Sequence, residues 1–183
     1  MTPAVTPYTT RLLTPDTWDD FAALVEANNG VWGGCWCIGF HPEGITKDST
    51  VAGNREAKLA HVNNGTIHQM LVYRDGRCVG WCQYGPPTEV ATIKNPKAYE
   101  KGLAELPDWR IGCIFTNAKD RGRGVAAAAV ANSVAAIEPA SAVCSGGRFR
   151  CWSVERPFYK FDGIDCRLEL DTKLVNRLIH RCW

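Results

Sequence analysis

The sequence predicts a single α/β domain in which helices flank one mixed, twisted β-sheet. The first observation is a hairpin pattern, because two strand-like runs, residues 67–73 and 78–84, are joined by the sequence Arg-Asp-Gly-Arg. Asp-Gly between two apolar runs favours a hairpin, since both residues tolerate positive φ. The second observation is a strand-like run at residues 109–115. It is followed by a loop with two glycines and an alanine- and valine-rich segment that ends near Ile137.

The totals for the chain agree with one enzyme-sized domain over residues 1–183. A length of 183 residues and a hydrophobic fraction of 45% are ordinary for one globular domain. A formal net charge of +2 argues against a broad nucleic-acid-binding face. There is no long apolar run that could cross a membrane, and residues 1–10 lack the basic start and apolar core of a signal peptide. We therefore expect a cytoplasmic protein without a nucleic-acid or membrane partner.

The first elements along the chain are a strand over residues 8–13 and a helix that begins at Thr14. Thr14 is a suitable N-cap, and Pro15 suits the first turn. Apolar residues then recur at helical spacing, namely Trp18, Phe21, Ala22 and Val25. Asn-Asn-Gly at residues 28–30 ends this helix. We expect residues 31–40 to form an irregular buried segment, and residues 55–62 to form a second short helix.

The chain has nine cysteines, and the tightest cluster is Cys35, Cys37 and His41. These three could supply metal ligands, but a fourth is missing and Cys-x-Cys is not the usual zinc-binding spacing. Without an export signal, most of the cysteines are expected to act as small buried hydrophobes. We therefore predict no metal site here, and instead a Trp- and Cys-rich segment packed into the core or lining a pocket.

A long excursion with four prolines occupies residues 85–108 and precedes the strand at 109–115. Connections of this length inside a compact domain are usually functional, and this one could face a substrate. It could also contain a helix near residues 97–104.

The segment after that strand has the strongest chemical signal. The order strand, glycine-containing loop and helix directs unpaired backbone N–H groups and the positive end of a helix dipole at one point, which suits a phosphate. Gly122 and Gly124 let a ligand approach the backbone, Ala126 keeps the first helical turn narrow, and Arg121 and Arg123 add positive charge.

Two other phosphate-binding patterns fit this loop less well. A dinucleotide-binding loop requires a third glycine where this chain has Ala127. The nucleoside-triphosphate pattern G-x-x-x-x-G-K-[ST] is absent. A tight strand-to-helix turn with no ligand remains the structural alternative.

The sequence Arg121-Gly122-Arg123-Gly124-Val125-Ala126 resembles the R/Q-x-x-G-x-G/A signature of the GNAT superfamily of N-acyltransferases. The resemblance covers residues 8 to 137. The Trp/Cys-rich residues 33–40, the sequence Trp-Cys-Gln-Tyr-Gly-Pro at 81–86 and residues 94–109 are similar to a little-characterised bacterial GNAT subgroup. The resemblance implies a GNAT fold, with metal-independent transfer of acetyl from acetyl-CoA to an amine. The amine would belong to a small molecule or a protein, and the enzyme would be a monomer or homodimer.

The resemblance also assigns roles to individual residues. Backbone amides would hold the CoA pyrophosphate at Arg121, Gly122, Arg123, Gly124, Val125 and Ala126. The pantetheine arm would lie along the strand at Ile114, Phe115 and Thr116. A backbone N–H near Cys113 or Ile114 would polarise the thioester carbonyl, and Cys113 itself would be a packing residue. The base that deprotonates the amine stays open among Glu89, Glu100, Glu105, Asp108, His61 and His68.

The ending of the chain, residues 138–183, is atypical of the family. Phe158-Tyr159-Lys160-Phe161-Asp162-Gly163-Ile164 resembles the family's F-Y-x-x-x-G-F stretch, which implies that Tyr159 is the general acid for the CoA thiolate. The nearby Pro157 is awkward in the helix that should present this tyrosine. An alternative hypothesis is that the ending from Glu138 onward is altered or frameshifted. The protein would then be a catalytically degenerate GNAT-like domain that binds CoA or a partner protein.

Overall fold

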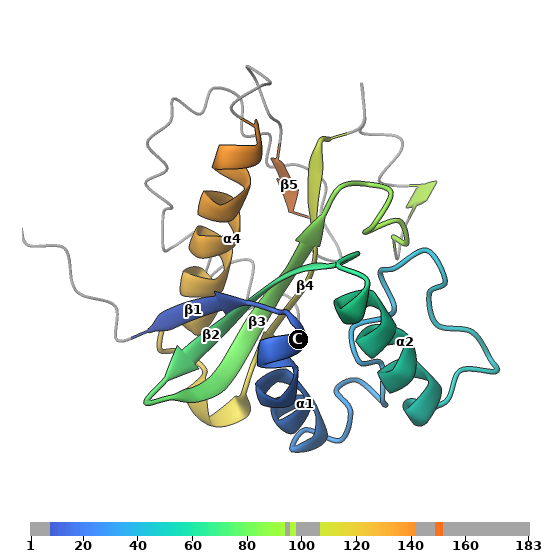
Figure 1. The fold of residues 1–183 in the computed structure, drawn as a ribbon, viewed down its shortest axis with the longest axis horizontal. Coiled ribbons are helices and arrows are strands. Elements are labelled where there is room, and N and C mark those ends of the chain that lie inside the picture. Colours follow the sequence, from blue (N-terminus) through green and yellow to red (C-terminus); the bar gives the residue numbers. More distant parts are fainter. Residues whose placement is uncertain (1–7, 94–95, 98–106, 142–148, 152–183) are drawn as a thin grey trace, which may run out of the picture.

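The computed structural model describes residues 8–93, 96–97, 107–141 and 149–151, and these residues contain a five-stranded mixed sheet (Figure 1). The strand order is β1-β2-β3-β4-β5, with the first four strands antiparallel and β4 parallel to β5. The strands are β1 (Thr9–Leu12), β2 (His68–Arg74), β3 (Arg77–Gly85), β4 (Trp109–Thr116) and β5 (Phe149–Cys151). A single mixed sheet flanked by helices is the architecture that the sequence predicts.

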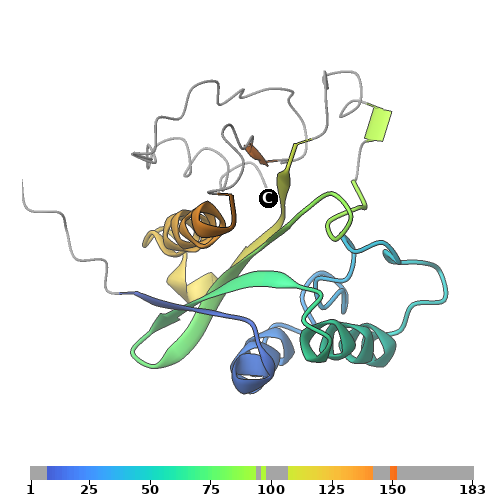
Figure 2. The ribbon, with the colours of Figure 1, turned by 45° about the horizontal axis from the view of Figure 1, so that its top comes forward.

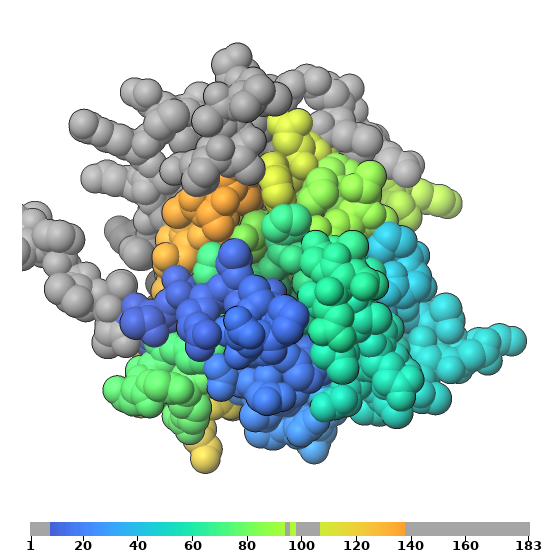
Figure 3. Space-filling model, viewed as in Figure 1, coloured from blue at the N-terminus to red at the C-terminus, as the bar shows by residue number. Residues whose placement is uncertain are grey.

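The helices lie on both sides of this sheet (Figure 2). They are α1 (Trp18–Glu26) and α2 (Val51–Asn63) on one side, α4 (Val125–Ser141) on the other, and two short 3₁₀ turns, η1 (Pro15–Thr17) and η2 (Ala118–Asp120). In the space-filling view, α1 and α2 lie beside each other on the surface (Figure 3). Within the described part of the chain, no helix is both long enough and apolar enough to cross a membrane.

Hydrophobic side chains fill a core on each face of the sheet, because successive side chains of a strand point to opposite faces. On the α1 side, Trp81 of β3 stacks on Phe115 of β4 with ring centroids 4.4 Å apart, and Phe21 of α1 packs edge-on against Trp81. On the α4 side, the core includes Val79 and Val125. Both cores continue along the sheet, so each face of β3 and β4 is held by a different helix.

Local sequence signals account for most element boundaries. The hairpin turn is confirmed, with φ of 52° at Asp75 and 71° at Gly76. The helix α2 begins at Val51, four residues before the expected start at 55, because the Thr50 hydroxyl accepts a hydrogen bond from Gly53 N at 3.0 Å. Gly53 lowers helix propensity in this first turn and conceals the true start in the sequence. The helix α4 likewise continues to Ser141, four residues beyond the expected end.

Residues 31–40, between α1 and α2, form an irregular and mostly buried segment, as the sequence predicts. Four of its non-glycine residues adopt positive φ, namely Val31, Trp32, Trp36 and Cys37. Such backbone conformations are costly outside glycine and persist only where surrounding packing fixes them. Here Trp36 stacks on Trp18 of α1, and its side chain is 2% exposed. The tertiary packing therefore holds this segment in a conformation that its sequence does not favour.

Candidate functional site

The edge of β4 that faces β5 is only partly covered by the described residues. Strand β5 pairs with Trp109, Arg110 and Ile111, whereas β3 pairs with β4 along nearly its whole length. From residue 112 to 116, no described strand pairs with this edge. The predicted pantetheine-binding residues Ile114, Phe115 and Thr116 all lie in this stretch. A strand edge of this kind can pair with an extended ligand by backbone hydrogen bonds.

A β-bulge interrupts β4 at Gly112. Gln83 of β3 is opposite Cys113, but Tyr84 is opposite Ile111, so Gly112 is an extra residue on β4. A bulge bends a strand and redirects its backbone groups. Glycine is required there, because a Cβ on Gly112 would lie 2.8 Å from Cγ1 of Val90. The bulge immediately precedes Cys113 and Ile114, whose N–H groups are the predicted polarising donors.

A buried carboxylate fixes the loop that follows β4. Asp120, in η2, is fully buried and forms an ion pair with Arg74, whose Nη2 lies 2.5 Å from Oδ1. The other carboxylate oxygen accepts a hydrogen bond from Nδ2 of Asn117 at 2.8 Å. The Asn117 backbone N–H donates to the carbonyl of Val79 on β3 at 2.9 Å. The start of the glycine loop is therefore tied to both strands of the hairpin.

The glycine loop has the conformation that the sequence predicts. Gly122 and Gly124 have φ of 70° and 87°, and a Cβ at either position would meet no heavy atom within 4 Å. The first helical hydrogen bond joins Ala128 N to Gly124 O at 2.9 Å. The N–H groups of the first turn therefore have no acceptor within the helix, as at any helix start. Gly122 and Gly124 are exposed, whereas Val125 and Ala126 are buried beneath them.

Close packing positions this helix start against the sheet. A Cβ on Gly80 of β3 would lie 2.5 Å from the Phe115 carbonyl oxygen and 2.8 Å from Cγ1 of Val125. Only glycine permits this approach. At the far side of the loop, the Tyr8 hydroxyl donates a 2.7 Å hydrogen bond to the Arg123 carbonyl. The exposed part of the loop, including Arg121 and Arg123, is thus supported from both sides.

One histidine–carboxylate pair lies at the opposite end of the same strands. Glu89 accepts from the His68 backbone N–H at 2.7 Å, and its second oxygen lies 2.6 Å from His68 Nδ1. The Glu89 side chain is 10% exposed and that of His68 is 42% exposed. The His68 ring also contacts Trp109, the first residue of β4, with centroids 5.2 Å apart. Its place on a long loop would suggest a carboxylate in solvent, but Glu89 is instead paired with His68.

The other candidate bases do not join the His68–Glu89 pair in the described residues. His61 pairs with Glu43, at 2.7 Å between Nε2 and Oε1, rather than with the strands around β4. Asp108 is exposed and precedes β4 directly. Glu100 and Glu105 lie outside the described residues, as do most of the helix expected near 97–104 and the predicted general acid Tyr159.

A cluster of thiols and one lysine lies beneath β4, and sequence reasoning missed it. The Sγ atoms of Cys37 and Cys113 are 3.1 Å apart, and the Trp81 indole N–H donates to Cys37 Sγ at 3.2 Å. Lys58 of α2 is fully buried, and burial lowers its pKa to about 8 although the neighbouring thiolates act in the opposite direction. Burial raises the pKa of Cys37, but the Cys113 hydrogen bond, the Lys58 charge and the Trp81 N–H together lower it below its ordinary value.

The same burial makes the other groups around this cluster neutral. Burial and the hydrogen bond to Cys37 raise the pKa of Cys113 well above its ordinary value. Burial, with the charges of Lys58 and His61, lowers the pKa of His41 to about 2. The Cys113 thiol is 4% exposed, so it packs in the core beneath β4. No spacing in the sequence indicates this cluster, because its members come from four separate segments.

The comparisons with known proteins identify the fold. No protein-family model and no curated protein matches the sequence. Among solved structures, the chain is similar to aminoglycoside N-acetyltransferase AAC(6')-Iy in complex with CoA, with a TM-score of 0.53, 13% identity, and coverage of 84% of this chain and 81% of that chain. A second structure of AAC(6')-Iy, in complex with the bisubstrate analog CoA-S-monomethyl-acetylneamine, has a TM-score of 0.50, 16% identity, and coverage of 93% and 88%. At such identities the likeness shows the fold alone, and this chain has the GNAT fold of the N-acetyltransferases.

Proposed function

We propose that the protein is a cytoplasmic N-acetyltransferase that transfers acetyl from acetyl-CoA to an amine. The observation that carries this proposal is the continuity of two features of β4. The edge of β4 at residues 112–116, with which no described strand pairs, leads directly into an exposed glycine loop at the start of α4. Together they offer backbone pairing for an extended arm and N–H groups for a pyrophosphate. Of the two solved neighbours, one is a complex with CoA and the other with a CoA-containing bisubstrate analog, which supports the same ligand here.

The cofactor would lie along β4 from its end toward its bulge. The amides of Arg121 to Ala126 would bind the pyrophosphate, and Ile114, Phe115 and Thr116 would pair with the pantetheine arm. This direction brings the thioester to the bulge at Gly112, beside the N–H groups of Cys113 and Ile114. A preorganised donor at a developing oxyanion is typically worth about 3 kcal/mol of barrier lowering.

We further propose that the His68–Glu89 pair accepts the proton of the amine. An amine is mostly protonated at neutral pH and becomes a nucleophile only when it loses that proton. Glu89 holds His68 Nδ1 at 2.6 Å, which leaves Nε2 to accept a proton. His68 contacts Trp109, and Trp109 begins the strand that would bind the cofactor. Tyr159 stays the predicted acid for the CoA thiolate.

The test is isothermal titration of acetyl-CoA into the wild-type chain and two matched variants. Gly124→Trp fills the open space of the loop, so it should weaken binding by at least about ten-fold. Gly65→Trp is the control, because Gly65 is also exposed, has φ of 64° and has no heavy atom within 4 Å of a Cβ. It introduces the same backbone strain away from the loop and should leave the dissociation constant unchanged.

The possible outcomes separate this function from its alternative. Binding by the wild type that Gly124→Trp alone removes would support the cofactor site, and release of free CoA thiol with a panel of amines would then establish turnover. Binding without turnover toward any amine class would favour the degenerate CoA-binding domain. A folded wild-type chain that binds no acetyl-CoA would refute the acetyltransferase proposal.

A further inference from the structure

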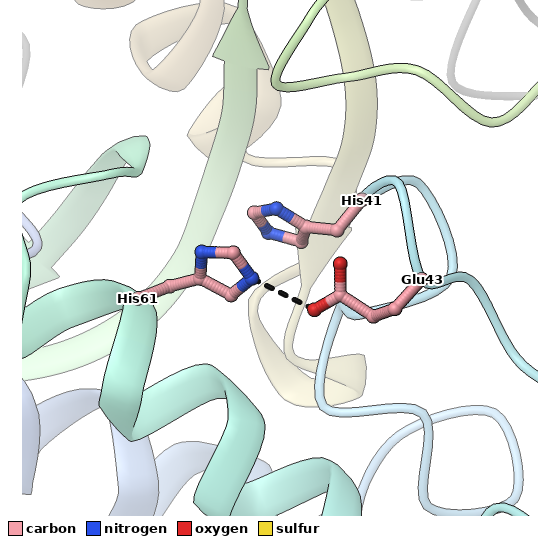
Figure 4. A group of neighbouring side chains, drawn as sticks. All are labelled: His41, Glu43 and His61. Carbon is pink, nitrogen blue, oxygen red and sulfur yellow. Dashed lines mark hydrogen bonds and ion pairs between the residues drawn. The ribbon is translucent and has the colours of Figure 1, made fainter.

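A second polar cluster lies where residues 41–43 meet α2, away from the glycine loop. It consists of His41, Glu43 and His61, whose side chains point toward one another (Figure 4). One potential ligand atom from each residue lies within 4.8 Å of the other two. The three residues come from two elements, so the cluster joins the irregular segment before α2 to the last turns of that helix.

His41 has the fewest polar contacts in the cluster. It is fully buried, and among the described residues its Nδ1 has no hydrogen-bond partner. Its Nε2 lies 2.8 Å from Nε2 of Gln83 on β3, while Oε1 of Gln83 also lacks a partner. Buried polar atoms without partners are rare in folded proteins, and a ring nitrogen that ligates an ion is one physical cause of such an atom.

A bound cation would give the unpartnered Nδ1 of His41 a partner. A half-turn of the Gln83 amide would let Oε1 accept a hydrogen bond from His41 Nε2–H. His41 Nδ1 would then carry the lone pair that a metal requires. This arrangement, in which the second ring nitrogen of a ligating histidine donates to an oxygen, is the usual outer shell of a metal-bound histidine.

His61 and Glu43 are arranged to complete such a site. His61 Nε2 lies 2.7 Å from Glu43 Oε1, and His61 Nδ1 lies 2.8 Å from the Thr66 hydroxyl. A cation would take the place of the proton between Nε2 and the carboxylate, while Thr66 would hold the other ring nitrogen. The His41 and His61 rings stack face to face, with centroids 4.3 Å apart and planes 19° apart, so they are already neighbours, and one ring would turn for both to direct a nitrogen lone pair at one ion.

The site is open on one side, because the side chains of His61 and Glu43 are 22% and 42% exposed. An ion can therefore enter from solvent, and a water molecule can fill a further coordination position. Two imidazole nitrogens and one carboxylate oxygen form a ligand set suited to zinc, which accepts three protein ligands and a water. The set does not include the cysteines that the sequence brings near His41, namely Cys35 and Cys37.

We propose that His41, Glu43 and His61 bind a divalent transition-metal ion, Zn²⁺ in particular, which ties residues 41–43 to α2. Rotation of the side chains, including a turn of one of the two stacked rings, would bring their ligand atoms to about 2.0–2.2 Å from the ion. Binding would release the proton held between His61 and Glu43. The competing interpretation is an ordinary His61–Glu43 ion pair beside a buried neutral histidine.

The first experiment titrates Zn²⁺ into the full chain after dialysis against EDTA, with binding followed by calorimetry and by the midpoint of thermal unfolding. The wild type should bind one equivalent and unfold at a higher temperature when it is loaded. Glu43→Gln and His61→Gln should each weaken binding at least ten-fold. Both side chains are partly exposed, so neither change empties the core. His68→Gln is the matched control, since His68 is also paired with a carboxylate but has no third ligand nearby, and it should leave Zn²⁺ binding unchanged.

The second experiment replaces Zn²⁺ with Co²⁺, because the spectrum of Co²⁺ distinguishes its ligands. The proposed site should give visible d–d bands without the ultraviolet charge-transfer band of a thiolate ligand. A thiolate band that disappears in Cys35→Ser or Cys37→Ser would place the ion on the cysteines and overturn the proposal. Failure of the wild type to bind Zn²⁺, or equal binding by wild type, Glu43→Gln and His61→Gln, would also overturn it.

Discussion

Lys58 is a fully buried lysine whose ammonium group has no hydrogen-bond partner among the described residues. Its Nζ lies 5.8 Å from the centre of the Phe21 ring, and the thiol of Cys37 is among the groups that favour its charge. A buried charge is costly unless it is paired, because the protein interior solvates it poorly. The lowered pKa of Lys58, about 8, expresses this cost. Near neutral pH, the buried charge of Lys58 therefore lowers the free energy of unfolding.

Replacement of this charge should stabilise the protein in a pH-dependent manner. The pKa of Lys58 falls from 10.5 to about 8, so between these values the unfolded chain binds more protons than the folded chain. The contribution of Lys58 to stability therefore rises with pH across this window. Lys58→Met should raise the free energy of unfolding by up to about 3 kcal/mol at pH 7, at 1.36 kcal/mol per pKa unit, and by much less at pH 10.5. Urea unfolding of both proteins at the two pH values measures the difference. A gain that does not depend on pH would contradict the assignment.

The proposed proton acceptor makes a second prediction at the scale of single residues. His68→Gln removes the ring nitrogen that would accept the proton, so kcat should fall about 100-fold or more, as for the loss of other general bases. The dissociation constant of acetyl-CoA should not change, because His68 lies at the other end of the strands from the glycine loop. Glu89→Gln should have a smaller effect, since it removes only the group that orients the ring.

The pH profile of kcat distinguishes this role from a structural one. A general base gives a rate that falls as the base becomes protonated, and this limb should be lost in His68→Gln. If the variant loses activity but keeps the wild-type pH profile, His68 supports the structure of the site without accepting the proton.

At the scale of elements, the site depends on how the β2–β3 hairpin holds the loop after β4. Arg74, at the end of β2, forms the ion pair with the buried Asp120, and Asn117 binds both Asp120 and the backbone of Val79. Gly80 lets β3, β4 and α4 approach closely. The Tyr8 hydroxyl donates to the Arg123 carbonyl within the glycine loop. The conformation of the loop therefore follows from the elements on either side of it.

This dependence predicts that Asp120→Asn weakens both stability and cofactor binding. The change leaves Arg74 without its buried counter-charge and should cost about 2 kcal/mol of the free energy of unfolding, since Arg74 is partly exposed and the loss of a fully buried pair costs 3–5 kcal/mol. Acetyl-CoA affinity should fall in the same variant. Urea unfolding and calorimetric titration measure the two effects.

The matched control is Asp75→Asn, because Asp75 also pairs with Arg74, at 3.7 Å, but its side chain is 93% exposed. Exposed pairs contribute little, so this variant should stay within about 0.5 kcal/mol of the wild type. Equal losses in the two variants would mean that the buried pair does not fix the loop.

At the scale of the whole molecule, the fold brings the bulge of β4, the end of that strand and the start of α4 into succession. A ligand that binds across these elements stabilises the folded state by mass action. Acetyl-CoA at 100 times its dissociation constant should add about 2.7 kcal/mol to the free energy of unfolding. Thermal unfolding should show this shift for the wild type and for Gly65→Trp. If Gly124→Trp shows an equal shift, the cofactor binds somewhere other than the loop.

The fold and the strand–loop–helix order around the glycine loop could be predicted from sequence because their signals are local. Asp75-Gly76 favours positive φ at two adjacent residues, and the strand–loop–helix order around Gly122 and Gly124 can be recognised within about twenty residues. The sequence pattern places the start of α2 four residues late, because Gly53 weakens the helical pattern that the Thr50 cap restores. The error arises because the low helix propensity of Gly53 opposes the capping preference of Thr50.

The pairing of the candidate side chains outside the loop could not be predicted, although several were candidate bases, because their partners are distant along the chain. Glu89 meets His68 across 21 residues, His61 meets Glu43 across 18, and Cys37 meets Cys113 across 76. Each residue alone resembles an ordinary loop carboxylate, helix histidine or core cysteine. Only packing around the sheet decides which of these groups become buried, which lose their water and which acquire a charged neighbour.

The sequence by itself thus determined the α/β class, the hairpin and the glycine loop that precedes a helix, since turn and helix-end geometry depend on adjacent residues. The tertiary structure alone decided the bulge of β4, the His68–Glu89 pair and the His41–Glu43–His61 cluster. The physical reason is that burial and electrostatic contact are properties of three-dimensional neighbours. A linear pattern can specify which elements form, but the chemistry of a site depends on the packing of those elements.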